Sequence, residues 1–186
     1  MKRILSLDIS SSTIGWSVFN ISFKNKEIIL VDYGNIKPPS KKKAESLSLG
    51  ISYRLSKISE FTKDLLESHN PDIIVSEDYA RKFAAGRSSA NTIMILATVN
   101  EVVALESFRH SGVEVFRMPV SKIRKILRDQ YNSQAKDKED ILNLMLDIFN
   151  NFKIKKNRSG NIKKECFDEA DAMAVGVSFF HMELEK

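Results

Sequence analysis

The order of strand and helix patterns along the chain predicts an α/β fold, with a mixed five-stranded sheet and helices on both of its faces. Three strand patterns joined by short links come first, and two more follow, each after a helical pattern. Short links join antiparallel neighbours, whereas strands connected through a helix run parallel with a right-handed crossover. We therefore predict the strand order 3-2-1-4-5, in one domain that spans residues 1–186.

Three antiparallel strands are predicted at residues 3–9, 15–22 and 27–34. The first is a short apolar run, typical of a buried strand, and the second alternates large apolar side chains with smaller ones. Pro38 and Pro39 break the pattern after the third strand, so the meander ends there.

Helices and strands alternate in the rest of the chain. Two strands are predicted at residues 72–77 and 113–117, with a loop at 78–88. Apolar residues at helical spacing predict five helices, at residues 44–68, 89–110, 119–128, 135–149 and 167–183. The helix over 89–110 has small and apolar residues throughout, so we expect it to be well buried.

The composition is typical of a soluble globular protein, with 42% hydrophobic and 28% charged residues. No apolar stretch has the length of a membrane span, and the N-terminus lacks the apolar segment of a secretory signal. Cys166 is the only cysteine, which excludes an internal disulfide and a multi-cysteine zinc site. We expect an intracellular protein without a membrane partner.

The net charge of +5 favours a polyanionic partner, and its distribution is more informative than its size. One basic run is Lys41–Lys43. A second run comes immediately before Asp168 and consists of Lys153, Lys155, Lys156, Arg158, Lys163 and Lys164. Either run alone is as typical of a solvated loop as of a binding surface for an anion. Basic loops that flank an acidic pocket would attract phosphate from both sides.

Four acidic residues, Asp8, Glu77, Asp168 and Asp171, stand at the ends of predicted strands or near the start of the last helix. Strands 1 and 4 are expected to be parallel neighbours, which places Asp8 beside Glu77 at their carboxyl ends, where ligand sites lie in such sheets. Asp168 and Asp171 are three residues apart and share one helix face. Small residues on this helix leave room for close approach to the sheet: Ala170, Ala172, Ala174 and Gly176.

Carboxylates that share one pocket need cations to neutralise them. Carboxylate oxygens suit Mg²⁺ or Mn²⁺, and two such ions about 4 Å apart can clamp the attacking water and the leaving oxygen of an in-line displacement. Each acid also has an ordinary explanation. Asp168 could complement a helix N-terminus, Glu77 could end its strand in solvent, and Asp8 could cap a turn with Ser10, Ser11 or Ser12.

Three segments resemble, in order, the motifs of RuvC-type nucleases, a group that includes the RuvC-like part of CRISPR effector nucleases. They are residues 4–18, ILSLDISSSTIGWSV; residues 73–81, IIVSEDYAR; and residues 168–176, DEADAMAVG. The resemblance spans nearly the whole chain. It implies an RNase H-like fold and magnesium held by the four acids. It also implies a cytoplasmic protein, bacterial or encoded by a phage in a bacterial host.

At this size the resemblance points to a resolvase of Holliday junctions or other branched DNA that acts as a homodimer. Two symmetric nicks on a four-way junction need two active sites related by a two-fold axis. Each nick would leave a 5′-phosphate and a 3′-hydroxyl. The family carries lysines near the scissile phosphate, and residues 120–125 and 135–138 resemble such segments. Lys122 and Lys138 are therefore candidate catalytic residues. The alternative for both is an ordinary solvated lysine on a helix surface.

Further DNA contacts are expected outside the acids. Tyr79 or Phe83 could stack on an unpaired base at the junction centre, or could instead be buried under the long helix. The residues expected to bind DNA phosphates are Arg81, Lys82, Arg87, Lys125, Lys155, Lys156 and Arg158.

The chain departs from the bacterial resolvase pattern in three places. Residues 150–166 are longer and more basic, no glycine-rich stretch precedes Lys138, and Glu165 stands where a histidine is common. These departures leave open whether junctions, forks or flaps are preferred.

Three other hypotheses about the function remain open. Residues 8–13 also resemble the phosphate loop of sugar kinases and actin-like ATPases, although those proteins need two such domains and a glycine-rich adenosine motif, and this chain has seven glycines. A non-catalytic module that binds branched DNA is the second alternative. The third is a transposase-related catalytic domain.

Overall fold

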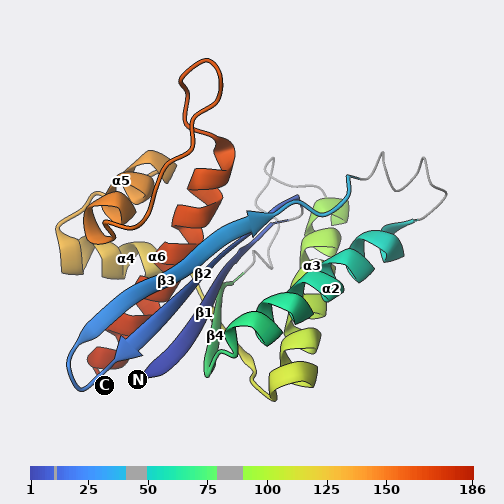
Figure 1. Cartoon of the computed structure of the whole chain (residues 1–186), viewed down its shortest axis with the longest axis horizontal. Helices are drawn as coiled ribbons and strands as arrows, with labels where there is room; N and C mark the ends of the chain where they lie inside the picture. Colours follow the sequence, from blue (N-terminus) through green and yellow to red (C-terminus); the bar gives the residue numbers. More distant parts are fainter. Residues whose placement is uncertain (11, 41–49, 79–89) are drawn as a thin grey trace.

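The computed structural model describes residues 1–10, 12–40, 50–78 and 90–186 (Figure 1). Its strands form one sheet in the order β3-β2-β1-β4-β5, which confirms the predicted order. β2 pairs antiparallel with β1 and β3, whereas β4 pairs parallel with β1 and β5. The strands are β1 Lys2–Ile9, β2 Ile14–Ser22, β3 Glu27–Ile36, β4 Ile73–Glu77 and β5 Val115–Met118.

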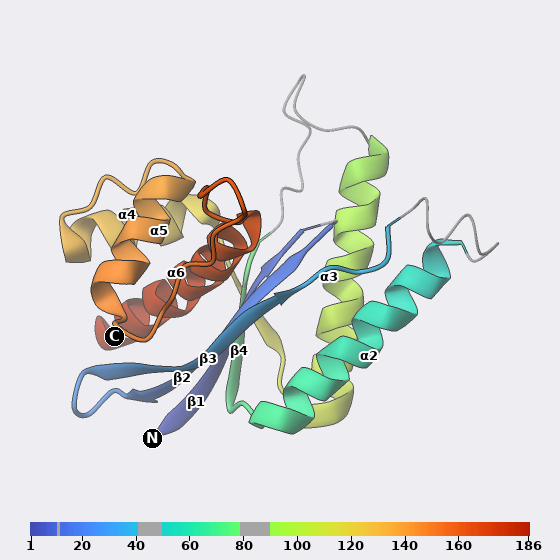
Figure 2. The same cartoon turned by 45° about the horizontal axis from the view of Figure 1, so that its top comes forward.

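Helices cover both faces of the sheet, as predicted (Figures 1 and 2). One face carries α2 Ile51–His69 and α3 Ala90–Ser111, and the other carries α4 Val120–Tyr131, α5 Lys138–Ile148 and α6 Lys164–Leu184. Within the described ranges, none of these helices combines the length and the apolar character needed to cross a membrane. Residues 44–49 of the predicted helix 44–68 lie outside the described residues.

Alternation along the strands divides the core into two layers. Ile4 packs in the cluster on the α4, α5 and α6 side, while its neighbour Leu5 packs in the cluster under α2 and α3. In β4, Val75 and Ile74 divide in the same way. Because side chains alternate with a period of two, Asp8 and Glu77 share the faces of Ile4 and Val75 respectively. Both acids are therefore on the side of the sheet that α6 covers.

Two predicted helix starts are wrong by three residues. α5 begins at Lys138 rather than at 135, because the Asp137 side chain accepts hydrogen bonds from the amides of Glu139 and Asp140 and fixes the helix start there. α6 begins at Lys164 rather than at 167. Asp168 therefore lies beyond the first turn, which removes the helix N-terminus as the main reason for an acid at this position.

The expectation that the helix over 89–110 is well buried is wrong. In α3, Met94 is 66% exposed, Phe108 57% and Leu105 47%, and the buried residues are Val99, Asn100, Val103 and Ser107. The helix packs with one stripe, and its other side carries apolar residues at the surface. Composition alone does not separate these two sides, because both are apolar.

Candidate active site

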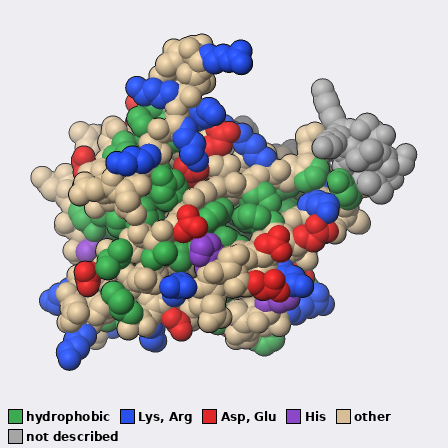
Figure 3. Space-filling model, viewed as in Figure 1, with side chains coloured by type: hydrophobic (Ala, Val, Ile, Leu, Met, Phe, Trp, Pro, Cys, Tyr) green, Lys and Arg blue, Asp and Glu red, His purple; other side chains and the backbone are tan. Residues whose placement is uncertain are grey.

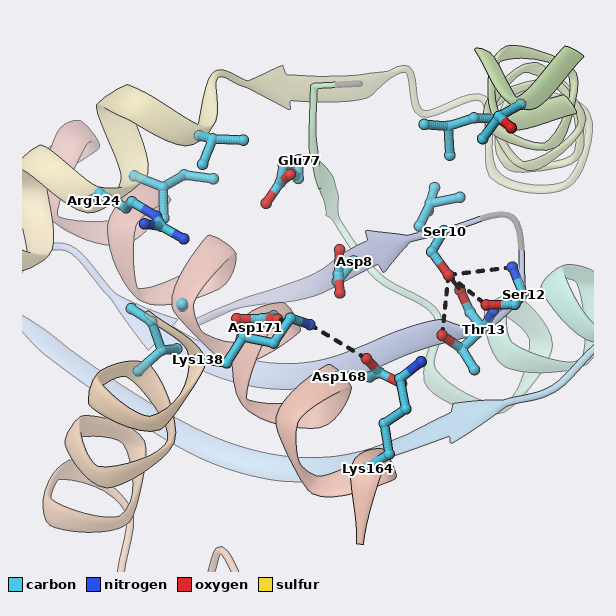
Figure 4. Close-up of a pocket in the computed structure, with 17 residues that line it drawn as sticks. Asp8, Ser10, Ser12, Thr13, Glu77, Arg124, Lys138, Lys164, Asp168 and Asp171 are labelled. Carbon is cyan, nitrogen blue, oxygen red and sulfur yellow. Dashed lines mark hydrogen bonds and ion pairs between the residues drawn. The ribbon is translucent and has the colours of Figure 1, made fainter. Parts of the chain in front are cut away.

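A cavity of about 490 Å³ is lined by all four predicted acids, Asp8, Glu77, Asp168 and Asp171 (Figure 4). Leu7 of β1 pairs with Ser76 of β4 in the parallel register, so the next residues along the two strands are Asp8 and Glu77. The sheet thus brings together two carboxylates from positions 69 residues apart, at the carboxyl ends of adjacent strands. The predicted neighbourhood of these two acids is confirmed.

The last helix reaches this site because a glycine opposite Asp8 lets it approach the sheet. Gly15 of β2 pairs with Asp8, and a Cβ atom at Gly15 would lie 2.1 Å from the carbonyl oxygen of Asp168. A Cβ atom at Gly176 would lie 2.4 Å from the Phe19 ring. Backbone contact this close is possible only without a side chain. The predicted close packing of α6 is confirmed, and it sets Asp168 against the end of β1.

Burial and mutual repulsion make the pocket carboxylates costly to ionise. Burial first, and then the negative charges of Asp171 and Glu77, raise the pKa of Asp8 to about 8. Burial and Asp171 raise the pKa of Glu77 to about 7, and burial is also the main cause that raises the pKa of Asp171. A pocket with such carboxylates favours any group that brings positive charge.

Lys138 brings one such charge from the first residue of α5. Its Nζ atom lies 2.7 Å from Asp171 Oδ2 and 3.6 Å from Asp168 Oδ1. Burial opposes the charged ammonium, but the hydrogen bond and the charge of Asp171 outweigh it, so the pKa of Lys138 is raised. The structure thus places this predicted residue in the pocket, as the direct partner of two of the acids.

The donor set fits a hard divalent cation in chemical type. Carboxylate oxygens are the ligands that Mg²⁺ prefers, and Asp168 Oδ2 is a buried oxygen with no hydrogen-bond partner among the described residues. No three His, Cys, Asp or Glu side chains in the described ranges are already close enough to form a ready-made metal site. Binding of a metal ion would therefore require the carboxylates to move closer together. In this structure the ammonium of Lys138 neutralises the charges of Asp168 and Asp171 instead.

Lys122 does not line the pocket, although the sequence made it a catalytic candidate; Arg124 lies there instead (Figure 4). The exposed side chain of Lys122 belongs to another side of α4. Val120, Ile123 and Arg124 all line the cavity, and their i, i+3, i+4 spacing is the signal that could have identified Arg124. The charge of Arg124 opposes the rise in the pKa of Glu77.

The turn after β1 is closed by Ser10 and not by Asp8. Ser10 Oγ accepts hydrogen bonds from the amides of Ser12 and Thr13, and its hydroxyl donates to the Thr13 carbonyl. This arrangement leaves the Asp8 carboxylate facing the cavity. Ser11 lies outside the described residues.

A second hollow adjoins the acidic pocket. It shares Ser12, Thr13, Thr92 and Lys164 with the first and adds the cations Lys37 and Arg54. The basic residues of this hollow extend the site on the side of α2 and β3. Sequence patterns did not single out Lys164 for the pocket, because its place depends on the earlier start of α6.

The remaining predicted DNA contacts fall into three groups. Lys125, Lys156 and Arg158 are exposed and do not line the pocket. Lys155 already has a partner, since its Nζ atom lies 3.1 Å from Glu169 Oε1. The third group lies outside the described residues, together with Lys41–Lys43: Tyr79, Arg81, Lys82, Phe83 and Arg87.

Comparison with solved structures gives the fold a set of relatives, although no protein-family model and no curated protein sequence matches the chain. RuvC of Thermus thermophilus, in complex with a Holliday junction substrate, is 14% identical, with a TM-score of 0.68 over 99% of this chain and 96% of that one. The yeast mitochondrial Holliday junction resolvase Ydc2 is 12% identical, with a TM-score of 0.65 over 99% and 80%.

A viral protein has the same fold. The fowlpox virus resolvase, in complex with Holliday junction DNA, is 19% identical, with a TM-score of 0.55 over 98% of this chain and 99% of that one. At these identities the comparisons establish architecture, and all three cover nearly the whole chain. The chain therefore has the RNase H-like fold of the RuvC-type Holliday junction resolvases.

Proposed function

We propose that this chain is a metal-dependent, structure-selective DNA endonuclease that resolves Holliday junctions or other branched DNA by paired nicks. The observation that carries the proposal is the convergence of Asp8, Glu77, Asp168 and Asp171 on one cavity. The fold supports it, because RuvC, Ydc2 and the fowlpox resolvase share the architecture that creates this convergence.

The four acids would hold two Mg²⁺ ions, with Mn²⁺ as a substitute. Bound Mg²⁺ supplies an activated water and stabilises the leaving oxygen, which gives 5′-phosphate and 3′-hydroxyl ends. The chain has to keep the carboxylates ionised for this role. Arg124 and Lys138 support it by opposing the rise in the pKa of Glu77.

Lys138 has two tasks in this proposal. Its ammonium lies 2.7 Å from Asp171 and neutralises the pocket before substrate is bound. The same ammonium would then stabilise the negative charge that a scissile phosphate gains in the transition state. Lys164, on the pocket wall, is positioned to hold a neighbouring phosphate.

We further propose that the active form is a homodimer, because paired nicks require two sites related by symmetry. The support from this chain is an apolar patch on α3, which we define as Leu105 and Phe108. These side chains are 47% and 57% exposed. Large apolar residues exposed on one side of a helix are typical of a surface that another protein covers.

The proposal is tested with a substrate panel of four-way junction, fork, flap and linear duplex, each with Mg²⁺ or with EDTA. We expect cleavage of a branched substrate in Mg²⁺ only, with the linear duplex resistant. Equal cleavage of all four substrates would contradict structure selectivity. Absence of cleavage of every substrate would contradict the nuclease activity. Tight ATP binding in a thermal-shift assay, without cleavage, would favour the actin-like alternative.

A further inference from the structure

The segment of residues 153–164, here called the basic arm, holds the positive charge of this protein. It contains six Lys or Arg residues and no Asp or Glu, so its formal charge is +6, while the whole chain carries +5. The other residues together therefore carry −1. A basic net charge that comes entirely from twelve consecutive residues indicates a local binding surface for an anion and not a general property of the surface.

The basic arm is a closed hairpin. Lys156 pairs antiparallel with Ile162, and the amide of Lys163 donates to the carbonyl of Lys155 at 2.8 Å. At the tip, Asn157 Oδ1 accepts hydrogen bonds from the amides of Ser159 and Asn161. Gly160 takes the left-handed conformation that this turn needs, with φ of 82°. The amides of Asn157, Ser159, Gly160 and Asn161 thus all donate hydrogen bonds within the hairpin.

The base of the basic arm is fastened to the body of the protein. Ile154 and Ile162 pack against the core cluster under α6. The buried Cys166 Sγ atom accepts a hydrogen bond from the amide of Lys155 at 3.1 Å. Lys155 Nζ also lies 3.1 Å from Glu169, whose side chain is fully buried and accepts a second hydrogen bond from Asn35.

This fastening ties the basic arm to the acidic pocket. Glu169, which holds Lys155, follows Asp168 in α6, so the anchor and a pocket acid are consecutive residues of one helix. Lys164 ends the basic arm and lines the pocket. The hairpin projects from the body above the N-terminal end of α6, and Lys and Arg side chains gather on it at the top of Figure 3.

We propose that the basic arm is a preformed clamp for the phosphate backbone of one DNA arm, set at a fixed position relative to the acidic pocket. Lys156 and Arg158 make the contacts, since both are exposed and neither forms an ion pair with any residue of the described chain. Lys155 does not contact the DNA in this proposal; its ion pair with Glu169 holds the basic arm in position. The identity of the bound DNA follows from the proposed function, whereas the clamp itself follows from charge and geometry.

The test compares two double variants of the full chain in EDTA, where no cleavage occurs. Lys156→Ala with Arg158→Ala removes two charges from the basic arm. The control, Lys2→Ala with Lys24→Ala, removes two exposed charges near the end of β1 and β2 that lies away from the acidic pocket. Binding of a labelled four-way junction is measured over a series of KCl concentrations, and melting temperatures check that both proteins are folded.

We expect the arm variant to bind about tenfold more weakly per lost phosphate contact at 0.1 M salt, and its salt slope to fall by about 2, because each contact contributes about 0.9 to that slope. The control variant should match the wild type within about twofold. If the wild type binds DNA and both variants bind it as tightly as the wild type, the clamp is wrong, and this result does not bear on the nuclease proposal. Arm-dependent binding without Mg²⁺-dependent cleavage supports the clamp and contradicts the nuclease.

A tethered cleavage reagent gives the position of the clamp. Ser159→Cys at the hairpin tip can carry iron–EDTA, because the native Cys166 is buried. We expect cuts confined to one stretch of one junction arm, with Lys24→Cys as the control that gives none. Absence of local cuts would overturn the clamp, as would arm-dependent binding to phosphatidylglycerol vesicles by a protein that binds no DNA.

Discussion

At the scale of single residues, the pocket carboxylates lower the stability of the metal-free protein. Asp8 has a pKa of about 8 in the folded chain, against an ordinary value of 3.8. The folded state therefore binds a proton that the unfolded chain has lost between these two pH values, and stability falls as the pH rises through this window. The proposed metal ions would offset this loss of stability when they bind.

Asp8→Asn should therefore stabilise the metal-free protein. The gain should grow from pH 4 to pH 8 and reach on the order of 2 kcal/mol at pH 8, because the amide carries no charge to desolvate or repel. Denaturant unfolding in EDTA measures it. Addition of Mg²⁺ should raise the stability of the wild type more than that of the variant, since bound ligand stabilises the folded state. A variant that is less stable than the wild type at pH 8 in EDTA would contradict the account.

The sequence predicted that the four acids and Lys138 meet in one pocket, but it did not predict that Arg124 lines this pocket from α4 and that Lys122 does not. Acids at strand ends are recognisable because they interrupt apolar runs, and strand parity then fixes their face. Lys122 and Arg124 are both basic residues on one short helix, and only the spacing of Arg124 from Val120 and Ile123 distinguishes them in the sequence. The rotation of α4 about its axis decides between them, and that rotation follows from packing.

Arg124→Ala and Lys122→Ala form a matched pair for this distinction. We expect Arg124→Ala to slow junction cleavage by about 10-fold to 100-fold, because a positive charge on the pocket wall is lost where negative charge develops. Lys122→Ala should stay within about twofold of the wild type. Single-turnover rates at saturating enzyme report the difference. Equal losses in both variants would show that Arg124 has no special place in the site.

At the scale of secondary-structure elements, the site depends on how closely α6 approaches β2. Gly15 is the contact point, since a Cβ atom there would overlap the backbone at Asp168. Small residues in the last helix made close packing predictable from the sequence. The start of α6 was not predictable in the same way, because Lys163 precedes the helix without a side-chain cap.

Gly15→Ala should push α6 away from the sheet and separate Asp168 from Asp8. We expect a loss of about 1–3 kcal/mol in unfolding free energy, typical of an overpacked contact, together with loss of metal binding. Gly50→Ala is the matched control, because a Cβ atom there would have no neighbour within 4 Å in the part of the chain that the structure describes. Unfolding curves and Mn²⁺ titration followed by electron paramagnetic resonance measure both effects. Wild-type behaviour of Gly15→Ala would show that this contact does not position the helix.

At the scale of the whole molecule, the sheet order and the layering were predictable, because link lengths and crossover handedness leave few arrangements of these strands. The exposed side of α3 was not predictable, since its apolar residues resemble core residues in composition. In the proposed homodimer, a second copy of the chain would cover the exposed side chains Leu105 and Phe108 of α3.

Phe108→Glu should convert a homodimer into a monomer, because a charge in a covered apolar contact has no partner. Sedimentation velocity across a concentration series measures the assembly state. Val31→Glu, at an exposed apolar position on β3, is the control and should leave the assembly unchanged. A wild-type protein that is monomeric both alone and on junction DNA would contradict the dimer.

In the proposed active site, four carboxylates from distant parts of the chain jointly hold divalent cations. Crystals soaked in Mn²⁺ and measured at a wavelength with strong manganese anomalous scattering test it directly. We expect two anomalous peaks enclosed by Asp8, Glu77, Asp168 and Asp171, with the ammonium of Lys138 moved away from Asp171. A pocket without a peak at millimolar Mn²⁺, with Lys138 still bound to Asp171, would contradict it.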